Sequence, residues 1–341
     1  MASRGTVTET AQTGAVPCTL LGGFLGAGKT TLLNHILTSN HGERIAVVVN
    51  DFGEVSIDES LIAHRDETRI VLDNGCICCT VRGDLIDGVR ELLLSEPRPE
   101  RIVVEMSGIA DPGTVTRTFR LMQRRWPLEL DGVVALVDAE NFPPEHSEHH
   151  ILARDQLAVA DLVILNKTDL IGADATRALE QRLRGYVPHA RLLRAQHAVV
   201  PLEVLLGLHV PGALQNESAP VDHAGFVTHT IRFAPALALE LLREVSLELP
   251  ASVYRAKGIV HLADKPEHRM VLQIVGRRAA LSLGEPWGET PKGTTIVFVG
   301  SQDMDRSALD ALIASAVATD KKKTAPWSGA VHWLRERFSS R

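Results

Sequence analysis

The sequence predicts an α/β fold with two domains: a larger N-terminal domain built on a mostly parallel sheet, and a smaller C-terminal α+β domain. The chain has 341 residues, more than one compact domain usually needs. Up to about residue 208, short apolar runs alternate with helical patterns, as they do in βαβ units. From residue 225 onwards, strand-like runs follow one another between two helical segments, which is typical of an α+β domain.

Composition and charge exclude several classes of protein. Hydrophobic residues make up 45% and charged residues 23% of the chain, so a disordered chain is not expected. The 36 Lys and Arg residues against 42 Asp and Glu residues give a net charge of −6. The chain therefore lacks the strong positive charge that is typical of a protein that binds nucleic acid. No apolar run approaches the roughly 20 residues of a membrane span, and residues 1–16 lack an apolar secretory core. We therefore expect a cytoplasmic protein that binds no nucleic acid and no membrane.

The N-terminal domain is expected to contain seven strands. Near-continuous apolar runs, such as residues 162–165, are typical of strands that are covered on both faces. Leu32, Leu33 and Ile36 have the spacing of an amphipathic helix. The expected strands are residues 19–21, 44–50, 69–72, 101–106, 132–138, 161–166 and 191–194.

Changes in composition predict the domain boundaries. The expected segments are a flexible N-terminus (1–15), the first domain (16–208), a linker (209–224), the second domain (225–318) and a tail (319–341). In the second domain we expect strands at 226–233, 253–262, 270–283 and 294–299, and helices at 236–249 and 305–317. The tail is interpreted as solvated with a short frayed helix, or as an amphipathic segment that docks on a partner or membrane surface.

A phosphate-binding loop is the strongest motif. Residues 23–30 (GFLGAGKT) fit the pattern G-x-x-x-x-G-K-[ST] between an expected strand and an expected helix. Glycines let several backbone N–H groups approach a triphosphate, Lys29 can reach its β- and γ-phosphates, and the Thr30 hydroxyl can bind Mg²⁺. A glycine-rich turn with an unrelated lysine is the alternative. The residues expected to hold the nucleotide are Gly23, Gly26, Ala27, Gly28, Lys29, Thr30 and Thr31.

A second motif indicates the base. Residues 161–169 (DLVILNKTD) form an apolar strand that leads into N-K-x-D. The Asp169 carboxylate can accept hydrogen bonds from N1–H and the exocyclic amine of guanine, whereas adenine would leave it unpaired. Asn166 would steady this site, and the aliphatic stem of Lys167 can lie over the purine. Residues 195–196 are a weaker candidate to complete it, and an exposed strand-end cluster is the alternative to GTP binding.

Glu105 and Gly108 are expected beside the phosphate loop, because residues 101–106 form an apolar strand whose end faces that loop in a parallel sheet. The Glu105 carboxylate can hold the Mg²⁺ water shell or orient the attacking water, and the Gly108 N–H can contact the γ-phosphate. Lys29 and Glu105 are thus the catalytic candidates. Glu105 could instead cap the helix that follows.

Residues 73–80 (DNGCICCT) form a cysteine cluster. Cys76, Cys78 and Cys79 are spaced so that several thiolates can converge on one Zn²⁺ or Co²⁺ ion in a reducing compartment. Three sulfurs leave one coordination position open, which suits metal transfer. A buried turn and a redox pair are the alternatives, and Cys18 is expected in the core.

Acidic and histidine-rich segments supply further metal candidates. Residues 50–59 follow a strand and are placed to respond to the γ-phosphate. Within them, Glu54 is a candidate ligand of the thiolate-bound metal and Asp58 a candidate near Mg²⁺. Residues 146–150 (HSEHH) are either a metal-collecting loop or a plain polar loop.

Together, the phosphate loop, residues 75–79 (GCICC), 105–112 (EMSGIADP) and 166–169 (NKTD) resemble the CobW-type GTPases, relatives of the hydrogenase and urease nickel-maturation GTPases. Residues 255–260, 272–276 and 295–300 look like the C-terminal domain of that family, so the resemblance covers roughly residues 16–318. It implies a P-loop GTPase domain, GTP hydrolysis and binding of Zn²⁺ or Co²⁺. Asp51 stands where the family usually has Glu, and Met106 where it has Ser or Thr.

The resulting hypothesis is a GTP-hydrolysing metallochaperone that uses GTP/GDP and Mg²⁺ and delivers Zn²⁺, or alternatively Co²⁺, to a client metalloprotein or metal-inserting enzyme. A homodimer is compatible with it. One alternative is a nucleotide-gated module that senses metal and binds a partner with little turnover. Another is a P-loop ATPase or kinase, which Asp169 argues against.

Overall fold

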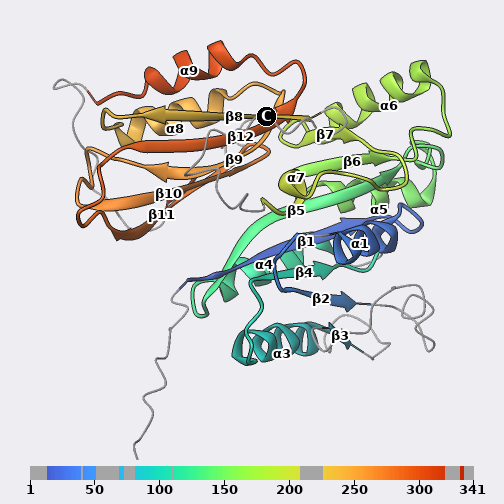
Figure 1. Cartoon of the computed structure of the whole chain (residues 1–341). Helices are drawn as coiled ribbons and strands as arrows, with labels where there is room; N and C mark the ends of the chain where they lie inside the picture. The colour runs from blue at the N-terminus through green and yellow to red at the C-terminus, as the bar shows by residue number, and fades with distance from the viewer. Residues whose placement is uncertain are drawn as a thin grey trace, which may run out of the picture.

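The computed structural model describes residues 14–39, 41–50, 69–72, 81–108, 111–207, 226–318 and 331–333. Two sheets organise them, one in each half of the chain (Figure 1). The first sheet has seven strands in the order β3-β2-β4-β1-β5-β6-β7, and the second has six in the order β13-β11-β10-β9-β12-β8. None of the helices in these residues is long and apolar enough to cross a membrane.

Every strand pair of the first sheet is parallel, which confirms the predicted fold class. The central strands are fully buried because helices cover both faces, as their continuous apolar runs predict. The strands are β1 (Val16–Gly23), β2 (Ile45–Asn50), β3 (Arg69–Leu72), β4 (Arg101–Glu105), β5 (Leu128–Asp138), β6 (Leu162–Asn166) and β7 (Arg191–Arg194).

Helices cover this sheet in two layers. One face packs against α1 (Lys29–Thr38) and the short α7 (Leu202–Leu206). The other face packs against α3 (Val81–Leu94), α4 (Pro112–Met122), α5 (Glu148–Leu157) and α6 (Ala173–Tyr186). Cys18, on β1, is fully buried beneath this second group of helices, as predicted, and burial raises the pKa of its thiol.

β5 begins four residues before the expected strand and contains a bulge. Its register against β1 passes from Leu130, opposite Cys18, to Gly132, opposite Thr19. Asp131 is therefore the extra residue of the bulge. Because a bulge redirects the side chain at that point, the Asp131 carboxylate meets partners from neighbouring elements instead of continuing the pleat.

The second sheet is antiparallel, and α8 (Leu239–Glu248) and α9 (Arg306–Ala314) share an apolar core with it. Its strands are β8 (Phe226–Phe233), β9 (Val253–Val260), β10 (His268–Val275), β11 (Arg278–Pro286), β12 (Thr294–Ser301) and β13 (Val331–Trp333).

One expectation for this half is wrong. Residues 270–283 were expected as one strand, but the chain turns at Gly276 and Arg277 and returns as β11. Gly276 has φ +60°, which only glycine adopts without strain, and a two-residue turn of this kind makes a hairpin. In the tail, for which a short frayed helix was one interpretation, residues 331–333 form a strand that pairs with β11, and the rest of the tail lies outside the described residues.

The second domain docks where the parallel strands begin, at the edge of the first sheet opposite the phosphate loop. Arg191, the first residue of β7, donates to the Leu249 carbonyl oxygen (2.9 Å). Arg278 of β11 donates to the carbonyl oxygens of Leu130 (3.2 Å) and Asp131 (2.7 Å) and pairs with Asp161 (3.1 Å). These contacts are buried, so the two domains share one interior.

Candidate nucleotide-binding site

The predicted phosphate loop connects β1 to α1, as expected. Gly28 caps the N-terminus of α1 with φ +102°, and Gly23 has φ +132°. A Cβ atom on Gly23 would lie 2.5 Å from the Leu136 carbonyl oxygen, and one on Gly28 would lie 2.5 Å from Asn166 Nδ2. Both positions thus need glycine for conformation and for space. The N–H groups at the start of α1 form the kind of site that binds phosphate.

Lys29 is buried under this loop. Its side-chain Nζ donates to the carbonyl oxygens of Gly23 (3.1 Å) and Phe24 (3.4 Å), so the ammonium group lies inside the curve of the loop. Thr30 is half-buried and Thr31 is exposed at the start of α1. A cation and a hydroxyl group are therefore held at the N-terminus of one helix, where a triphosphate would need them.

Glu105 and Gly108 lie beside the loop. Glu105, the last residue of β4, is only 6% exposed and lies opposite Leu21, two residues before Gly23. A Cβ atom on Gly108 would lie 3.0 Å from the Leu25 backbone nitrogen and 3.3 Å from the Gly23 carbonyl oxygen. The end of β4 thus places a carboxylate and a backbone turn against the phosphate loop, as parallel pairing predicts.

Asn166 joins the two predicted halves of the site. Its Nδ2 donates to the Ala27 carbonyl oxygen of the phosphate loop (2.9 Å), and its Oδ1 accepts from the Ala198 backbone N–H (2.8 Å). The side chain is 2% exposed, so both hydrogen bonds are protected from water. The amide therefore fixes the end of β6 and residues 195–201 to the phosphate loop.

Lys167 and Asp169 follow at the edge of the site. Lys167 has φ +61°, and its Nζ lies 2.6 Å from Asp138 Oδ2. Burial opposes ionisation of Asp138, but the hydrogen bonds from Lys167 and Asn141 outweigh it and lower the pKa of that carboxyl. Asp169 Oδ2 lies 3.9 Å from His197 Nε2. Thr168 donates through its backbone N–H (3.2 Å) and its hydroxyl (3.0 Å) to the Ala195 carbonyl oxygen.

Two family models match the chain. Residues 17–194 match the CobW/HypB/UreG nucleotide-binding domain, and residues 226–317 match the cobalamin synthesis protein cobW C-terminal domain. The first model alone covers more than half of the chain. The chain belongs to the CobW family. Asn166 and the phosphate loop to which its side chain is hydrogen-bonded therefore lie in a nucleotide-binding domain.

Similar CobW-family proteins match over nearly their whole length. "Zinc chaperone CobW" from Sinorhizobium sp is 32% identical, with 91% of this chain and 99% of the relative covered. "Zinc chaperone YjiA" from Escherichia coli (strain K12) is 34% identical, with 84% and 94% covered. The crystal structure of Zn(II)-bound YjiA GTPase from E. coli is 28% identical, covers 89% of this chain and 99% of its own, and has a TM-score of 0.39.

Several predicted site residues lie outside the described residues. These are Cys76, Cys78, Cys79, Glu54 and Asp58, so the roles assigned to them stay predictions. Asp51 also lies outside them.

The histidines at 146–150 have different neighbours. His150 is buried, its Nδ1 lies 3.1 Å from the Pro143 carbonyl oxygen, and its ring contacts those of Phe142 and Tyr186. His149 instead contacts the Phe24 ring of the phosphate loop, with centroids 5.8 Å apart. Within the described part of the chain, no group of three or more His, Cys, Asp and Glu side chains could hold a metal ion.

Sequence reasoning missed three residues next to this site. Asp138, at the end of β5, binds Lys167. His197 and Ala198 have φ values of +51° and +56° and shape the segment that faces Asp169 and Asn166. The run of small and polar residues after β7 was recognised only as a weak base-site candidate, because left-handed residues other than glycine leave no clear mark in a sequence.

Proposed function

We propose that this CobW-family protein is a GTP-hydrolysing metallochaperone, which binds Zn²⁺ through Cys76, Cys78 and Cys79 in a GTP-dependent way and delivers it to a client metalloprotein. The observation that carries the guanine-nucleotide part is Asn166, which ties the phosphate loop to residues 195–201 with Asp169 three residues further along. The metal part is supported by two similar proteins named zinc chaperones. Co²⁺ is the alternative cargo.

The residues around the loop fit Mg²⁺ and phosphoryl transfer to water. Thr30 supplies a hydroxyl and Glu105 a carboxylate, and these hard oxygen ligands suit this ion. Bound there, Mg²⁺ would neutralise charge on the β- and γ-phosphates. Lys29 would move from the loop carbonyls to the phosphates and stabilise the charge that develops on the γ-phosphoryl group. Asp58, a further candidate near Mg²⁺, lies outside the described residues.

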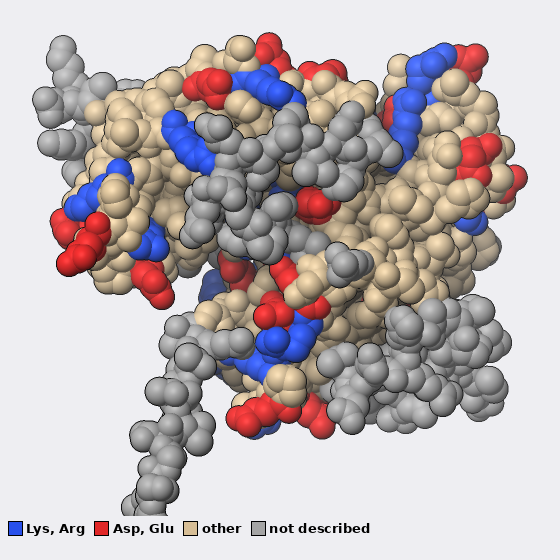
Figure 2. All heavy atoms as spheres, viewed as in Figure 1, with Lys and Arg blue, Asp and Glu red and all other residues tan. Residues whose placement is uncertain are grey.

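The charge on one face of the protein is mixed. On the face shown in Figure 2, Lys and Arg side chains are interspersed with Asp and Glu side chains, and the described residues there form no extended basic surface. The net charge of −6 agrees with this mixture. The partner that we propose is a client metalloprotein or a metal-inserting enzyme.

Zinc and nucleotide binding should be coupled. We expect GTP·Mg²⁺ to tighten zinc binding by about tenfold or more relative to GDP·Mg²⁺, and zinc to tighten GTP binding by the same factor, because coupling between two sites is reciprocal. A competition titration with a chelating zinc indicator measures the first quantity, and fluorescence titration with labelled GTP measures the second.

Two variants control this experiment. Cys78→Ser removes one of the clustered thiols and is expected to abolish the GTP-dependent zinc affinity, whereas Cys18→Ala removes only the buried thiol of β1 and should preserve it. Equal zinc affinity with GTP and GDP in the unaltered protein would contradict the coupling. If zinc does not stimulate GTP turnover, the second candidate is favoured, a nucleotide-gated module that senses metal and binds a partner.

A further inference from the structure

Arg255 joins the C-terminal domain to two elements of the nucleotide-binding domain. It lies on β9 and is 3% exposed. Its guanidinium pairs with the Asp131 carboxylate of β5, and its Nη1 donates to the carbonyl oxygens of Leu205 (3.1 Å) and Val204 (3.4 Å). These are carbonyls of the last turn of α7, which find no partner further along the helix. A cation there completes the helix end and complements its dipole.

The end of α7 is shaped for this guanidinium. Gly207 caps the helix in the left-handed conformation, with φ +57°. A Cβ atom on Gly207 would overlap Nε, Cζ and Nη2 of Arg255. Glycine is thus needed both to turn the chain and to let the guanidinium lie against the backbone. The C-terminus of α7 is therefore shaped to accept the Arg255 side chain.

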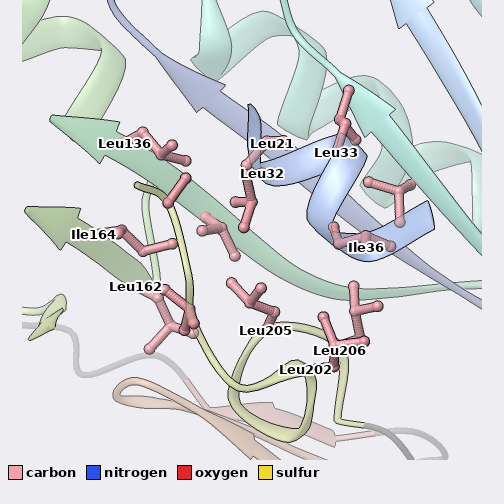
Figure 3. Close-up of a cluster of buried hydrophobic side chains, with 14 of the residues drawn as sticks. Leu21, Leu32, Leu33, Ile36, Leu136, Leu162, Ile164, Leu202, Leu205 and Leu206 are labelled. Carbon is pink, nitrogen blue, oxygen red and sulfur yellow. The ribbon is translucent and has the colours of Figure 1, made fainter. Parts of the chain in front are cut away.

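α7 in turn supports the helix that begins at the phosphate loop. Leu202, Leu205 and Leu206 lie in one apolar cluster with the α1 residues Leu32 and Ile36 (Figure 3). Close packing of this kind transmits a shift in one helix to the other.

A second connection runs through the backbone between β7 and α7. The Val200 carbonyl oxygen lies 3.2 Å from Nε2 of His35, which is on α1. Ala198 N–H binds Asn166, and the Ala195 carbonyl accepts both hydrogen bonds from Thr168. Residues 195–201 therefore contact Asn166 and Thr168 of the predicted base site and the last turn of α1, and α7 follows directly after them.

We propose that Arg255 is a positioning residue for guanine-nucleotide binding: by holding α7 against β5, it keeps residues 195–201 and α1 in the geometry that the nucleotide needs. The proposal rests on the guanine-nucleotide binding proposed above. Arg278 provides the contrast, because it crosses the same domain interface to Asp161, Leu130 and Asp131 and, among the described residues, makes no hydrogen bond to α7.

The test compares Arg255→Lys with Arg278→Lys in the full-length protein. A lysine at 255 can keep the ion pair with Asp131, but as a point charge it cannot also span the α7 carbonyls. We expect Arg255→Lys to raise the Kd for GDP and for GTP by about tenfold, and Arg278→Lys to change either by less than about twofold. Fluorescence titration gives the Kd values, and the thermal midpoint of each variant shows how far the interface has weakened.

The comparison at matched stability decides between a positioning role and a merely structural one. If both variants lose affinity in proportion to their loss of thermal midpoint, or if neither loses affinity, the proposal is wrong. A selective loss in Arg255→Lys, at a midpoint no lower than that of Arg278→Lys, supports it.

Hydrogen exchange on the unaltered protein gives a measurement that does not depend on a variant folding. GDP should slow exchange of backbone amides in residues 202–207 and 254–257, in addition to those of the phosphate loop. Protection of the phosphate loop alone would overturn the proposal. Absence of any GDP binding would instead overturn the proposed function, and this inference with it.

Discussion

The variant Asp169→Asn is expected to bind GDP about 10³-fold more weakly than the unaltered protein. The carboxylate would accept two hydrogen bonds from guanine, whereas the asparagine NH₂ group would face the guanine N1–H as one donor opposite another. Xanthine carries an oxygen in place of the exocyclic amine. The same substitution should therefore raise the affinity for XDP, and titration with labelled GDP and XDP measures both changes.

A matched control removes the same charge nearby. Asp174 lies in the first turn of α6 and pairs only with the exposed Arg177 among the described ion pairs. Asp174→Asn should change the affinity for GDP by less than about twofold, because exposed pairs of this kind contribute little. If Asp169→Asn bound GDP as tightly as this control, guanine recognition would have to come from other residues.

The variant Asp131→Asn is expected to lose about 3–5 kcal/mol of unfolding free energy. Asp131 is 4% exposed and lies 3.2 Å from Arg101 Nη1, while its other oxygen pairs with Arg255. Removing the carboxylate charge leaves two buried guanidinium groups without full compensation. Urea unfolding of the full-length protein measures the loss.

Glu43→Gln is the control for this loss. Glu43 accepts from the same guanidinium, at Arg101 Nε (3.0 Å), but its side chain is 21% exposed. Because water screens this half-buried pair, we expect a loss of only about 1 kcal/mol. Similar losses in the two variants would mean that burial does not determine the strength of the Asp131 interactions.

The loss in Asp131→Asn should depend on pH only under acidic conditions. Burial opposes ionisation of Asp131, but Arg255 and Arg101 outweigh it and lower the pKa of its carboxyl. A group whose pKa is lower in the folded state stabilises the fold above its unfolded pKa, about 4, and this contribution disappears as the pH falls through the folded pKa. The difference between the two proteins should thus be constant from pH 5 to pH 8 and shrink below about pH 4.

The sequence predicts the nucleotide-binding half well because its signals are local. The loop at residues 23–30 places glycine wherever φ is positive or the backbone approaches closely. β4 and β6 are buried throughout and apolar except at their ends, because both faces of the sheet are covered. Parallel pairing then puts Glu105 and Asn166 at the same edge of the sheet as the loop. These predictions need only the period of the hydrophobic residues, the spacing of the motif residues and the order of the strands and helices.

Long-range pairing explains what the sequence does not predict. Arg255 and Arg278 lie in ordinary strand patterns, and their partners on β5 and α7 are at least 50 residues away. The bulge at Asp131 leaves no composition signal, because it depends on register against β1. The turn at Gly276 does leave a sequence signal. A glycine followed by a polar residue stands between two apolar runs, which is typical of a two-residue hairpin.

The shared interior has a practical consequence for anyone who divides this gene. Val275 and Val299 of the C-terminal half belong to the same apolar cluster as Leu205 and Leu206. A fragment that ends at residue 207 would expose this apolar surface to water and would leave Asp161 without Arg278. Such a fragment invites aggregation during expression, so measurements of GTP turnover are best made on the intact polypeptide.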